Sequence, residues 1–431
     1  MIRNDAKIRQ ICTLFIAFLP LVKIVGAPAV FSGMCGEKLW ISAAILLALD
    51  FLLIFLFMFY ARRFEGVAFF DILSDGYGKV FAKAVFFVYG IFFLLKAFVP
   101  LCEYKYLVES GFYEVMPRSE IFFPMFALTF YISIKGLKVF ARCSEFVAPI
   151  TVVGLFVLFY LTVGSCDFAN LLPLFYGTGQ KEANCVYRNL FWFNDCSYLL
   201  LFCGHFKPEK KMTLRVCLSY IAPALATVFF FVCFYAVFYT VSPLEKTAIN
   251  AVSIFSVTLV NVGRFDYLAL FLLVLSGVFA LSLPVLAATK CFFRAFGATK
   301  STVPAIVVNG LLLAAVGTYS SKIDAVIEFF QAYLAPFFWV CGYGLPLLGL
   351  KNCIFKQKKP IEPAVKNSAV KPSAAKNLAV NKAETNKPET NKSIANKAVA
   401  DKGEANKAEK QKGEKAKTSA SKKRYAGGKA R

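Results

Sequence analysis

Histidine is almost absent from this chain of 431 residues, which contains one, His205. The 13 cysteines are scattered singly and form neither a CxxC pair nor a cluster with histidine, so the sequence predicts no metal site and no disulfide framework. The motifs of serine hydrolases, zinc peptidases and phosphate-binding loops are also missing. We therefore expect a protein that is not an enzyme and that needs no metal ion or cofactor.

Charge is scarce over most of the chain, since 17% of the residues are charged and 58% are hydrophobic. Soluble domains contain more charge and fewer apolar residues. Runs rich in Phe, Leu, Val and Ala recur between Ile11 and Leu350, and they are continuous where a transmembrane β-barrel would alternate. Lipid offers no partner to an unpaired backbone group, which favours helices. The sequence predicts an all-α integral membrane protein.

Residues 1–350 are expected to form one polytopic, permease-like membrane domain with ten transmembrane helices. Segment 135–145 is expected to be a loop, and segment 244–263 is expected to lie at the membrane interface. In chain order, the expected spans are 8–33, 40–60, 80–108, 121–134, a fifth ending at 163, 188–205, 216–240, 267–289, 303–319 and 327–350.

Basic residues predict the orientation of these spans. An even number of spans places both termini on one side, and the loops on that side contain about twice as many Lys and Arg residues as the opposite loops. The opposite loops are expected to carry acids such as Glu103 and Glu109. Both termini are therefore expected in the cytoplasm.

The net charge of +23 arises largely after Leu350, where apolar clusters end and a lysine recurs every fifth residue from Lys382 to Lys422. This period fits no helix face, so segment 351–431 is expected to be a disordered cytoplasmic tail rich in Lys, Ala and Asn. The tail is either simply solvated or docks electrostatically on anionic membrane lipid. Nucleic acid is not expected as a partner, because the tail offers only two aromatic residues, Phe355 and Tyr425, on which bases could stack.

Two of the expected spans are interrupted in their middle. Span 1 contains Pro20, which removes a backbone donor, and Gly26 a turn later. Span 6 contains Asn194 and Asp195 at its centre. Two discontinuous helices five spans apart are typical of inverted-repeat transporters, in which the half-helices meet at a binding site. Their free N–H groups suit a carboxylate and their free carbonyls suit an ammonium, so a small zwitterion such as an amino acid fits.

Four charged residues fall inside the expected spans: Lys23, Asp50, Lys96 and Asp195. Such residues are costly in lipid and usually face a cavity or each other. One interpretation is a structural ion pair of Asp195 with Lys23 or with Lys96, and another is a binding or gating site. Asp50 is expected either to be a pairing partner within the bundle or to lie less deep in its span than its position suggests. A lysine in this cavity could also take the place of a coupling cation such as sodium, because its ammonium can lose and regain a proton during the cycle.

Three motifs resemble landmarks of the endospore germination permeases: GEK at Gly36–Lys38 followed by WIS at Trp40–Ser42, GLKVFARCSE at Gly136–Glu145, and DFANLLP at Asp167–Pro173. These permeases are the GerAB-type B subunits of nutrient germinant receptors, a branch of the amino acid–polyamine–organocation superfamily. The resemblance covers about Gln10–Leu350. It implies a LeuT-like 5+5 inverted repeat with discontinuous helices 1 and 6, and a germinant pocket between spans 1, 3, 6 and 8.

The resemblance also implies partners and a location. The partners are the receptor's A subunit and its lipoprotein C subunit in the spore inner membrane, with a small-molecule germinant in the pocket. The centres of spans 1 and 6 depart from the glycine-rich pattern of relatives, which favours a ligand other than a simple neutral amino acid or a paralogue that no longer responds. The expected ligand-binding residues are Pro20, Leu21, Val22, Lys23, Gly26, Lys96, Phe193, Asn194, Asp195 and Cys196.

Three functions remain open from the sequence. The first is a germinant receptor subunit that senses a small nutrient, expected to be an amino acid, and triggers germination. The second is a proton-coupled secondary transporter of amino acids or amines. The third is a scaffold with a blocked pocket. A receptor needs different affinities in two conformations, whereas a transporter must also release its ligand on the far side of the membrane.

Overall fold

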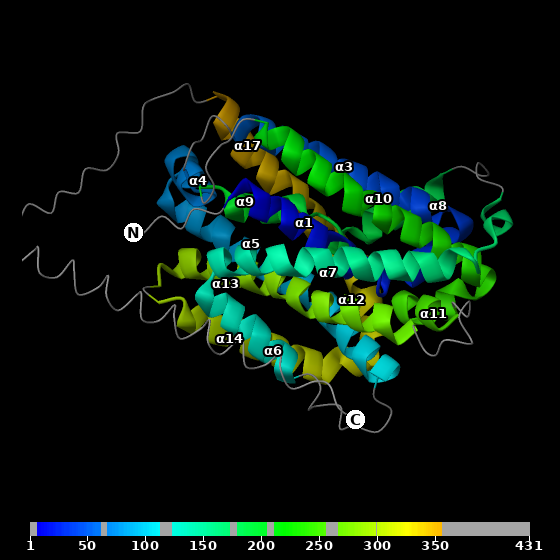
Figure 1. The fold of residues 1–431 in the computed structure, drawn as a ribbon. Coiled ribbons are helices and arrows are strands. Elements are labelled where there is room, and N and C mark those ends of the chain that lie inside the picture. Colours follow the sequence, from blue (N-terminus) through cyan, green and yellow to red (C-terminus); the bar gives the residue numbers. More distant parts are fainter. Residues whose placement is uncertain are drawn as a thin grey trace, which may run out of the picture. The chain divides into compact units, whose positions relative to one another are not determined.

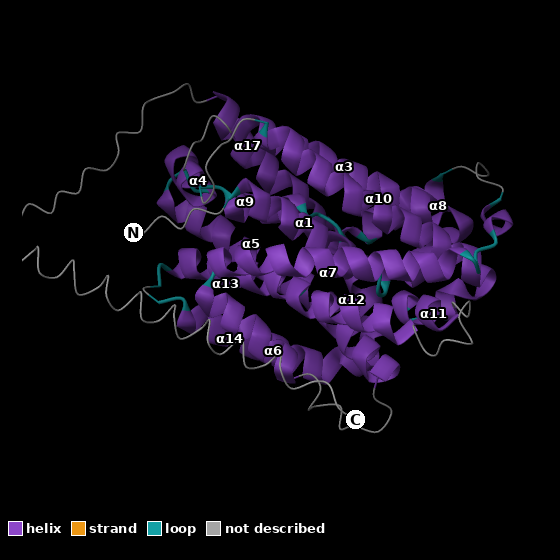
Figure 2. Ribbon diagram, in the orientation of Figure 1, coloured by secondary structure: helices purple, strands orange, loops and turns teal. Residues whose placement is uncertain are grey.

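The computed structural model describes residues 7–61, 67–112, 123–172, 179–204, 211–255, 266–298 and 300–355. Within these residues the secondary structure is helical throughout, with short loops (Figure 2). The predicted all-α class is thereby confirmed for the described part of the chain. His205 and the whole segment 356–431, which contains nearly all of the predicted tail, lie outside the described residues.

The first half of the chain forms helices close to the expected positions of spans 1 to 5. Their bounds are α1 Ile8–Lys23, α2 Ala27–Cys35, η1 Gly36–Lys38, α3 Leu39–Ala61, α4 Phe69–Tyr77, α5 Lys79–Phe112, α6 Phe123–Lys135, α7 Leu137–Val163 and η2 Phe168–Leu171. Two expectations need correction. The predicted loop 135–145 is helical from Leu137 onward, because Gly136, with φ of 81°, makes the whole reversal between α6 and α7. The amphipathic helix α4 was not predicted.

The second half repeats the pattern of long apolar helices joined by short helical turns. Its elements are α8 Gln180–Arg188, η3 Leu190–Trp192, α9 Cys196–Phe202, α10 Met212–Phe238, η4 Tyr239–Leu244, α11 Ala248–Phe255, α12 Asp266–Ala280, α13 Ser282–Phe296, α14 Thr302–Tyr319, η5 Ser320–Lys322, α15 Ile323–Phe329, η6 Phe330–Leu334, α16 Ala335–Trp339, η7 Val340–Gly344 and α17 Leu345–Phe355. The expected span 267–289 is divided at Leu281, just before Pro284. The turns η6 and η7 are π-helical.

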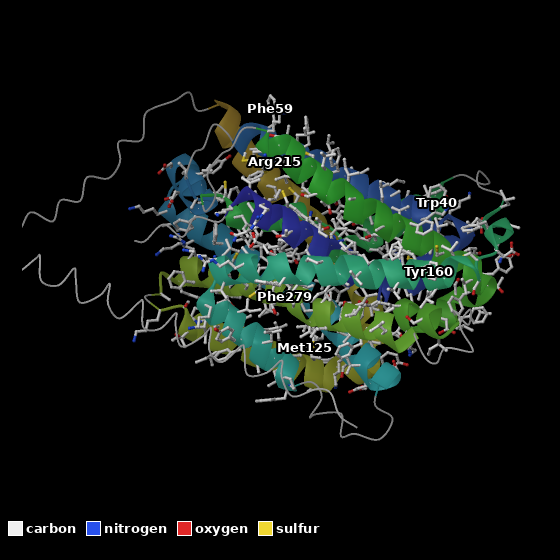
Figure 3. The ribbon with its side chains drawn as sticks, in the orientation of Figure 1. Trp40, Phe59, Met125, Tyr160, Arg215 and Phe279 are labelled. Atoms are coloured by element: carbon white, nitrogen blue, oxygen red, sulfur yellow. The ribbon has the colours of Figure 1, made fainter. Side chains whose placement is uncertain are left out.

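Six helical segments among the described residues are long and apolar enough to cross a membrane. Their outer surface is also apolar: large hydrophobic side chains are exposed along α3, α7, α10 and α14. Phe59 and Tyr160, labelled in Figure 3, are 57% and 73% exposed. So large an apolar exterior is unfavourable in water and is the surface that lipid covers. The chain is therefore an integral membrane protein.

Helix α1 lies in the interior of the bundle, packed against α7, α10 and α12 (Figure 1). The pair α5 and α13 forms a second long contact, and α3 packs along α10. Aromatic rings fill these interfaces; Phe140 of α7 stacks on Phe279 of α12 with ring centroids 4.5 Å apart. The packing buries residues 14–23 of α1 and residues 96–104 of α5 almost completely, so polar groups within these stretches face protein.

A surface ion pair connects Lys246, in the loop after η4, to Asp324 of α15, with 2.6 Å between Nζ and Oδ2. The hydrogen bond to Asp324 raises the pKa of Lys246 above its ordinary value. A lysine with a raised pKa contributes stability that is complete below its unfolded-state pKa, about 10.4, and lost as pH rises through the folded-state pKa.

We expect Asp324→Asn to lower the free energy of unfolding by less than about 1 kcal/mol at neutral pH, because both side chains are about half exposed. The difference from wild type should vanish at alkaline pH above the pKa of Lys246. Thermal unfolding in detergent at neutral and alkaline pH measures this, and a difference that grew with pH would contradict it.

Candidate functional site

The first helical break separates α1 from α2. Helix α1 ends at Lys23, Ile24–Gly26 form a bend, and α2 begins at Ala27. Pro20 has no N–H, and its carbonyl accepts the N–H of Ile24 in the last turn of α1. The predicted interruption of span 1 is confirmed, and it falls where Gly26 and Pro28 weaken the helix. Loops interrupt the bundle beside α1 in Figure 2.

The second break separates α8 and η3 from α9. Phe193 is extended, Asn194 adopts a left-handed conformation with φ of 66°, and α9 begins at Cys196. The interruption predicted at Asn194 and Asp195 is confirmed. The expected start of span 6 at Arg188 is wrong, because the helix begins at Gln180 and Arg188 is its last residue. Hydropathy did not indicate this first half-helix, because segment 180–184 is largely polar.

A buried ion pair joins the two breaks. Nζ of Lys23, at the end of α1, lies 2.7 Å from Oδ2 of Asp195, and both side chains have no exposed surface. The same ammonium donates to the carbonyl of Leu19 at 3.1 Å. Of the two ion pairs that the sequence allowed, the structure shows the one with Lys23. Each buried charge compensates the desolvation cost of the other, and removing one would leave the second with an uncompensated cost of several kcal/mol.

Asp50 of α3 completes this arrangement from the other side. Its Oδ2 accepts the backbone N–H of Asp195 at 2.9 Å, and its Oδ1 accepts the hydroxyl of Tyr343 at 3.0 Å. Asp50 has no exposed surface. The expectation of a partner within the bundle holds, although the partners are a backbone amide and a tyrosine. Tyr343 lies in the π-helical turn η7, and such turns often reposition functional residues.

Lys96 of α5 binds the backbone of the second break. Its Nζ donates to the carbonyl of Phe193 and, at 2.7 Å, to the carbonyl of Asn194. The ammonium also lies 4.8 Å from the ring centroid of Tyr198. The alternative in which Lys96 pairs with Asp195 is therefore not the geometry observed. Lys96 instead satisfies two carbonyls that the interrupted helix leaves without amide partners.

The remaining predicted residues are buried around these contacts. Pro20, Leu21 and Val22 form the last turn of α1, and the Leu21 carbonyl accepts the hydroxyl of Tyr104 at 2.9 Å. Gly26 is the N-cap residue of α2, and Cys196 is the first residue of α9. All ten predicted residues thus belong to the two breaks or to the α5 face that contacts them.

Four buried polar atoms at the start of α9 make no hydrogen bond to the described part of the protein. They are Nδ2 and Oδ1 of Asn194, Oδ1 of Asp195 and the hydroxyl of Tyr198. The Asn194 side chain packs on Gly342, where any larger residue would collide with it. Buried polar groups are almost always paired, so this cluster marks a place where a ligand or solvent can bind.

Glu103 of α5 was expected in an external loop, and this expectation is wrong. Its side chain is 2% exposed, inside a helix that continues to Phe112. Its Oε1 accepts the indole N–H of Trp192 at 2.9 Å, its carboxylate lies against Gly26, and its Oε2 has no hydrogen-bond partner among the described residues. The missed signal is spacing: residues seven apart share a helix face, which puts Glu103 in line with Lys96.

A cavity of about 210 Å³ lies elsewhere, near the end of α13. Aromatic rings of α4 and α5 line it, together with Leu200 of α9 and the basic side chains of Lys290 and Arg294. It contains none of the ten predicted residues, which are closed off from solvent. A ligand reaches the two breaks only if helices move.

Tyr343→Phe is expected to lower the free energy of unfolding by about 1–3 kcal/mol, since it leaves Oδ1 of Asp50 buried with one fewer donor. Tyr131→Phe, on the exposed face of α6, is the matched control and should change stability little. Chemical unfolding of both variants measures the difference. Equal stability of the two would show that Asp50 does not depend on Tyr343.

The broken helices, the buried charges and the apolar exterior define a permease-like membrane protein. A family model described as spore germination protein matches residues 7–322. The match covers more than half of the chain, so the protein belongs to the spore germination permease family. The resemblance inferred from the three sequence motifs is thereby confirmed. A search among curated proteins finds no match.

Proposed function

We propose that this chain is the B subunit of a nutrient germinant receptor and binds a small nutrient between the two helical breaks. The carrying observation is the cluster of unpartnered polar atoms on Asn194, Asp195 and Tyr198. A ligand that hydrogen-bonds to them recovers about 1–3 kcal/mol for each buried group that was unsatisfied. The proposed role is non-enzymatic, because these residues present hydrogen-bond partners and charges with no nucleophile–base pair.

The proposal includes ten membrane crossings in an inverted repeat. Helix α3, which is the main part of the segment Ala27–Phe59, and the other five long segments supply six crossings, and the pairs α1–α2 and α8–α9 and the short helix α6 supply three more. The segment Thr302–Lys351, with 50 residues, is long enough for two crossings divided at η5. In this scheme the broken helices are spans 1 and 6, five apart, as in LeuT-like proteins. Both termini lie on the cytoplasmic, or spore core, side.

Because the site is buried, ligand binding would be signalled to the partner subunits by a conformational change. Ligand entry requires the breaks to separate, so the ligand must favour one conformation over another by its differential affinity. The proposed partners, an A subunit and a lipoprotein C subunit in the spore inner membrane, read that conformational change. The breaks are suited to this role because the four charged residues lie on separate elements: α1, α3, α5 and the start of α9.

A ligand screen by thermal shift tests the proposal. Purified wild type is screened against amino acids, amines, sugars and nucleosides, beside Asn194→Ala and the surface control Asp324→Asn. We expect at least one compound to stabilise wild type and the control, with the effect lost in Asn194→Ala. Equal stabilisation of all three proteins, or no stabilisation by any compound, contradicts the proposal.

A proton-coupled transporter of amino acids or amines is the second candidate, favoured by titratable groups at both breaks. Uptake by proteoliposomes containing this chain alone distinguishes the two. A receptor subunit binds ligand without accumulating it, whereas accumulation driven by a proton gradient supports the transporter.

A further inference from the structure

The backbone groups exposed by the two breaks are already bound by charged side chains of the protein itself. The ammonium of Lys23 donates a hydrogen bond to the Leu19 carbonyl at the end of α1, and the ammonium of Lys96 donates to the carbonyls of Phe193 and Asn194. The backbone amide of Asp195 donates a hydrogen bond to Asp50, and the carboxylate of Glu103 lies against Gly26 at the first break. The site therefore differs from an open pair of half-helices that awaits both ends of a zwitterion.

The charges around α9 balance. Two lysines, Lys23 and Lys96, face two aspartates, Asp50 and Asp195, and all four are buried. A ligand carboxylate placed here meets the unpaired Oδ1 of Asp195 and finds only neutral donors, the Asn194 amide and the Tyr198 hydroxyl. To reach a charged or amide donor it must displace one of the protein's own carboxylates. The described residues thus disfavour a ligand carboxylate.

Glu103 is the charge that remains unbalanced. No salt bridge among the described residues includes it, and its Oε2 has no hydrogen-bond partner. If Glu103 is ionised, a buried negative charge lacks a counterion; if it is protonated, its O–H lacks an acceptor. Protonation of Glu103 therefore removes the uncompensated negative charge but leaves the carboxyl O–H without an acceptor. An ammonium group that donates to Oε2 supplies both the missing counterion and the missing hydrogen bond.

The position of Glu103 links it to both breaks. It contacts Gly26, where α2 begins, and Trp192, two residues before Asn194. A group bound to Oε2 is thus held by α5 and touches elements that must separate for ligand entry. The absence of a side chain at Gly26 is required for this approach, because a Cβ there would collide with the Glu103 carboxylate.

We propose that Glu103 is the ammonium-binding residue of this site and that the ligand is a small primary amine without a carboxylate. The ammonium donates to Oε2 of Glu103, and the remainder of the ligand is apolar or carries a neutral polar group for Asn194. This inference rests on the proposed function and narrows its ligand from nutrients in general, and from the amino acid expected from the sequence, to amines.

Matched probes test the inference on the full-length protein. Each set contains an amine, the corresponding amino acid and the corresponding acid: ethylamine, alanine and propionate; isoamylamine, leucine and isocaproate; phenethylamine, phenylalanine and hydrocinnamate. We expect one amine to bind wild type at least about 10-fold more tightly than its amino acid, because the amino acid also buries a carboxylate that has no charged donor here, a cost of that size or more. The corresponding acid, which lacks the ammonium, should not bind.

Two variants assign the effect to one residue. Glu103→Gln keeps the shape and loses the charge, so amine affinity should fall at least about 10-fold. Glu145→Gln, on the surface beside Arg9, should bind amines as wild type does. Should Glu103→Gln not fold, the ranking of the three probes on wild type decides alone.

The failures are distinguishable. An amino acid that binds as tightly as its amine, or unchanged amine affinity in Glu103→Gln, overturns the inference and leaves the proposed function intact. Binding of sugars or nucleosides alone also overturns it. Binding by no compound in the matched sets or in the wider screen overturns the inference and the proposed function together.

Discussion

Lys23→Met should lower the free energy of unfolding by about 3–5 kcal/mol, among the largest effects of any single substitution in this chain. The substitution keeps the apolar stem and removes the ammonium, so Asp195 remains buried without its cation. The carbonyl of Leu19 loses its donor at the same time. The measurement is the melting temperature and the yield of folded protein in detergent.

The matched control for Lys23→Met is the double variant Lys23→Met with Asp195→Asn, which removes both charges of the pair. We expect it to recover much of the lost stability, because the main cost of the single variant is an unpaired buried carboxylate. A double variant no more stable than Lys23→Met would mean that Lys23 acts mainly through packing and the Leu19 carbonyl.

Gly26→Val is expected to destabilise the protein by about 1–3 kcal/mol and to abolish ligand binding. The new side chain would occupy the position of the Glu103 carboxylate, and helix α2 would have to move away from α5. Gly310→Ala in α14 is the control, because nothing lies within 4 Å of the added Cβ. It should be neutral or slightly stabilising, since alanine favours helix over glycine.

A second substitution tests the stated cause of the Gly26→Val effect. Shortening the opposing side chain, in Gly26→Val with Glu103→Ala, should restore stability toward wild type and leave ligand binding absent. Thermal unfolding and the ligand screen measure these two properties separately. A double variant as unstable as Gly26→Val would place the clash somewhere other than Glu103.

Sequence patterns predicted the main features of the fold because the residues that break helices also interrupt apolar runs. Pro20 and Gly26 located the first break, and Asn194 with Asp195 located the second. The division between α12 and α13 was not predicted, since Pro284 lies in a run that stays apolar on both sides. Hydropathy registers polarity along the chain and is insensitive to a break within a uniformly apolar segment.

The candidate site was predicted only in part, for a related reason. Hydropathy suggests which charges are buried but gives no information on which partners they face. The sequence left the partner of Asp195 open between Lys23 and Lys96; the structure shows the pair with Lys23, whereas Lys96 binds backbone carbonyls and Glu103 lies inside the bundle. Tyr343 and Gly342, which contact Asp50 and Asn194, come from a π-helical turn that no periodicity in the sequence indicates.

Amide hydrogen exchange with a stabilising compound tests the central claim, a ligand site between the two breaks. We expect added protection in segments 19–27 and 189–198, because binding orders the backbone there. The cavity lined by Phe69, Lys290 and Arg294 is the rival location. Protection confined to 68–70 and 289–294, with none at the breaks, would contradict the account.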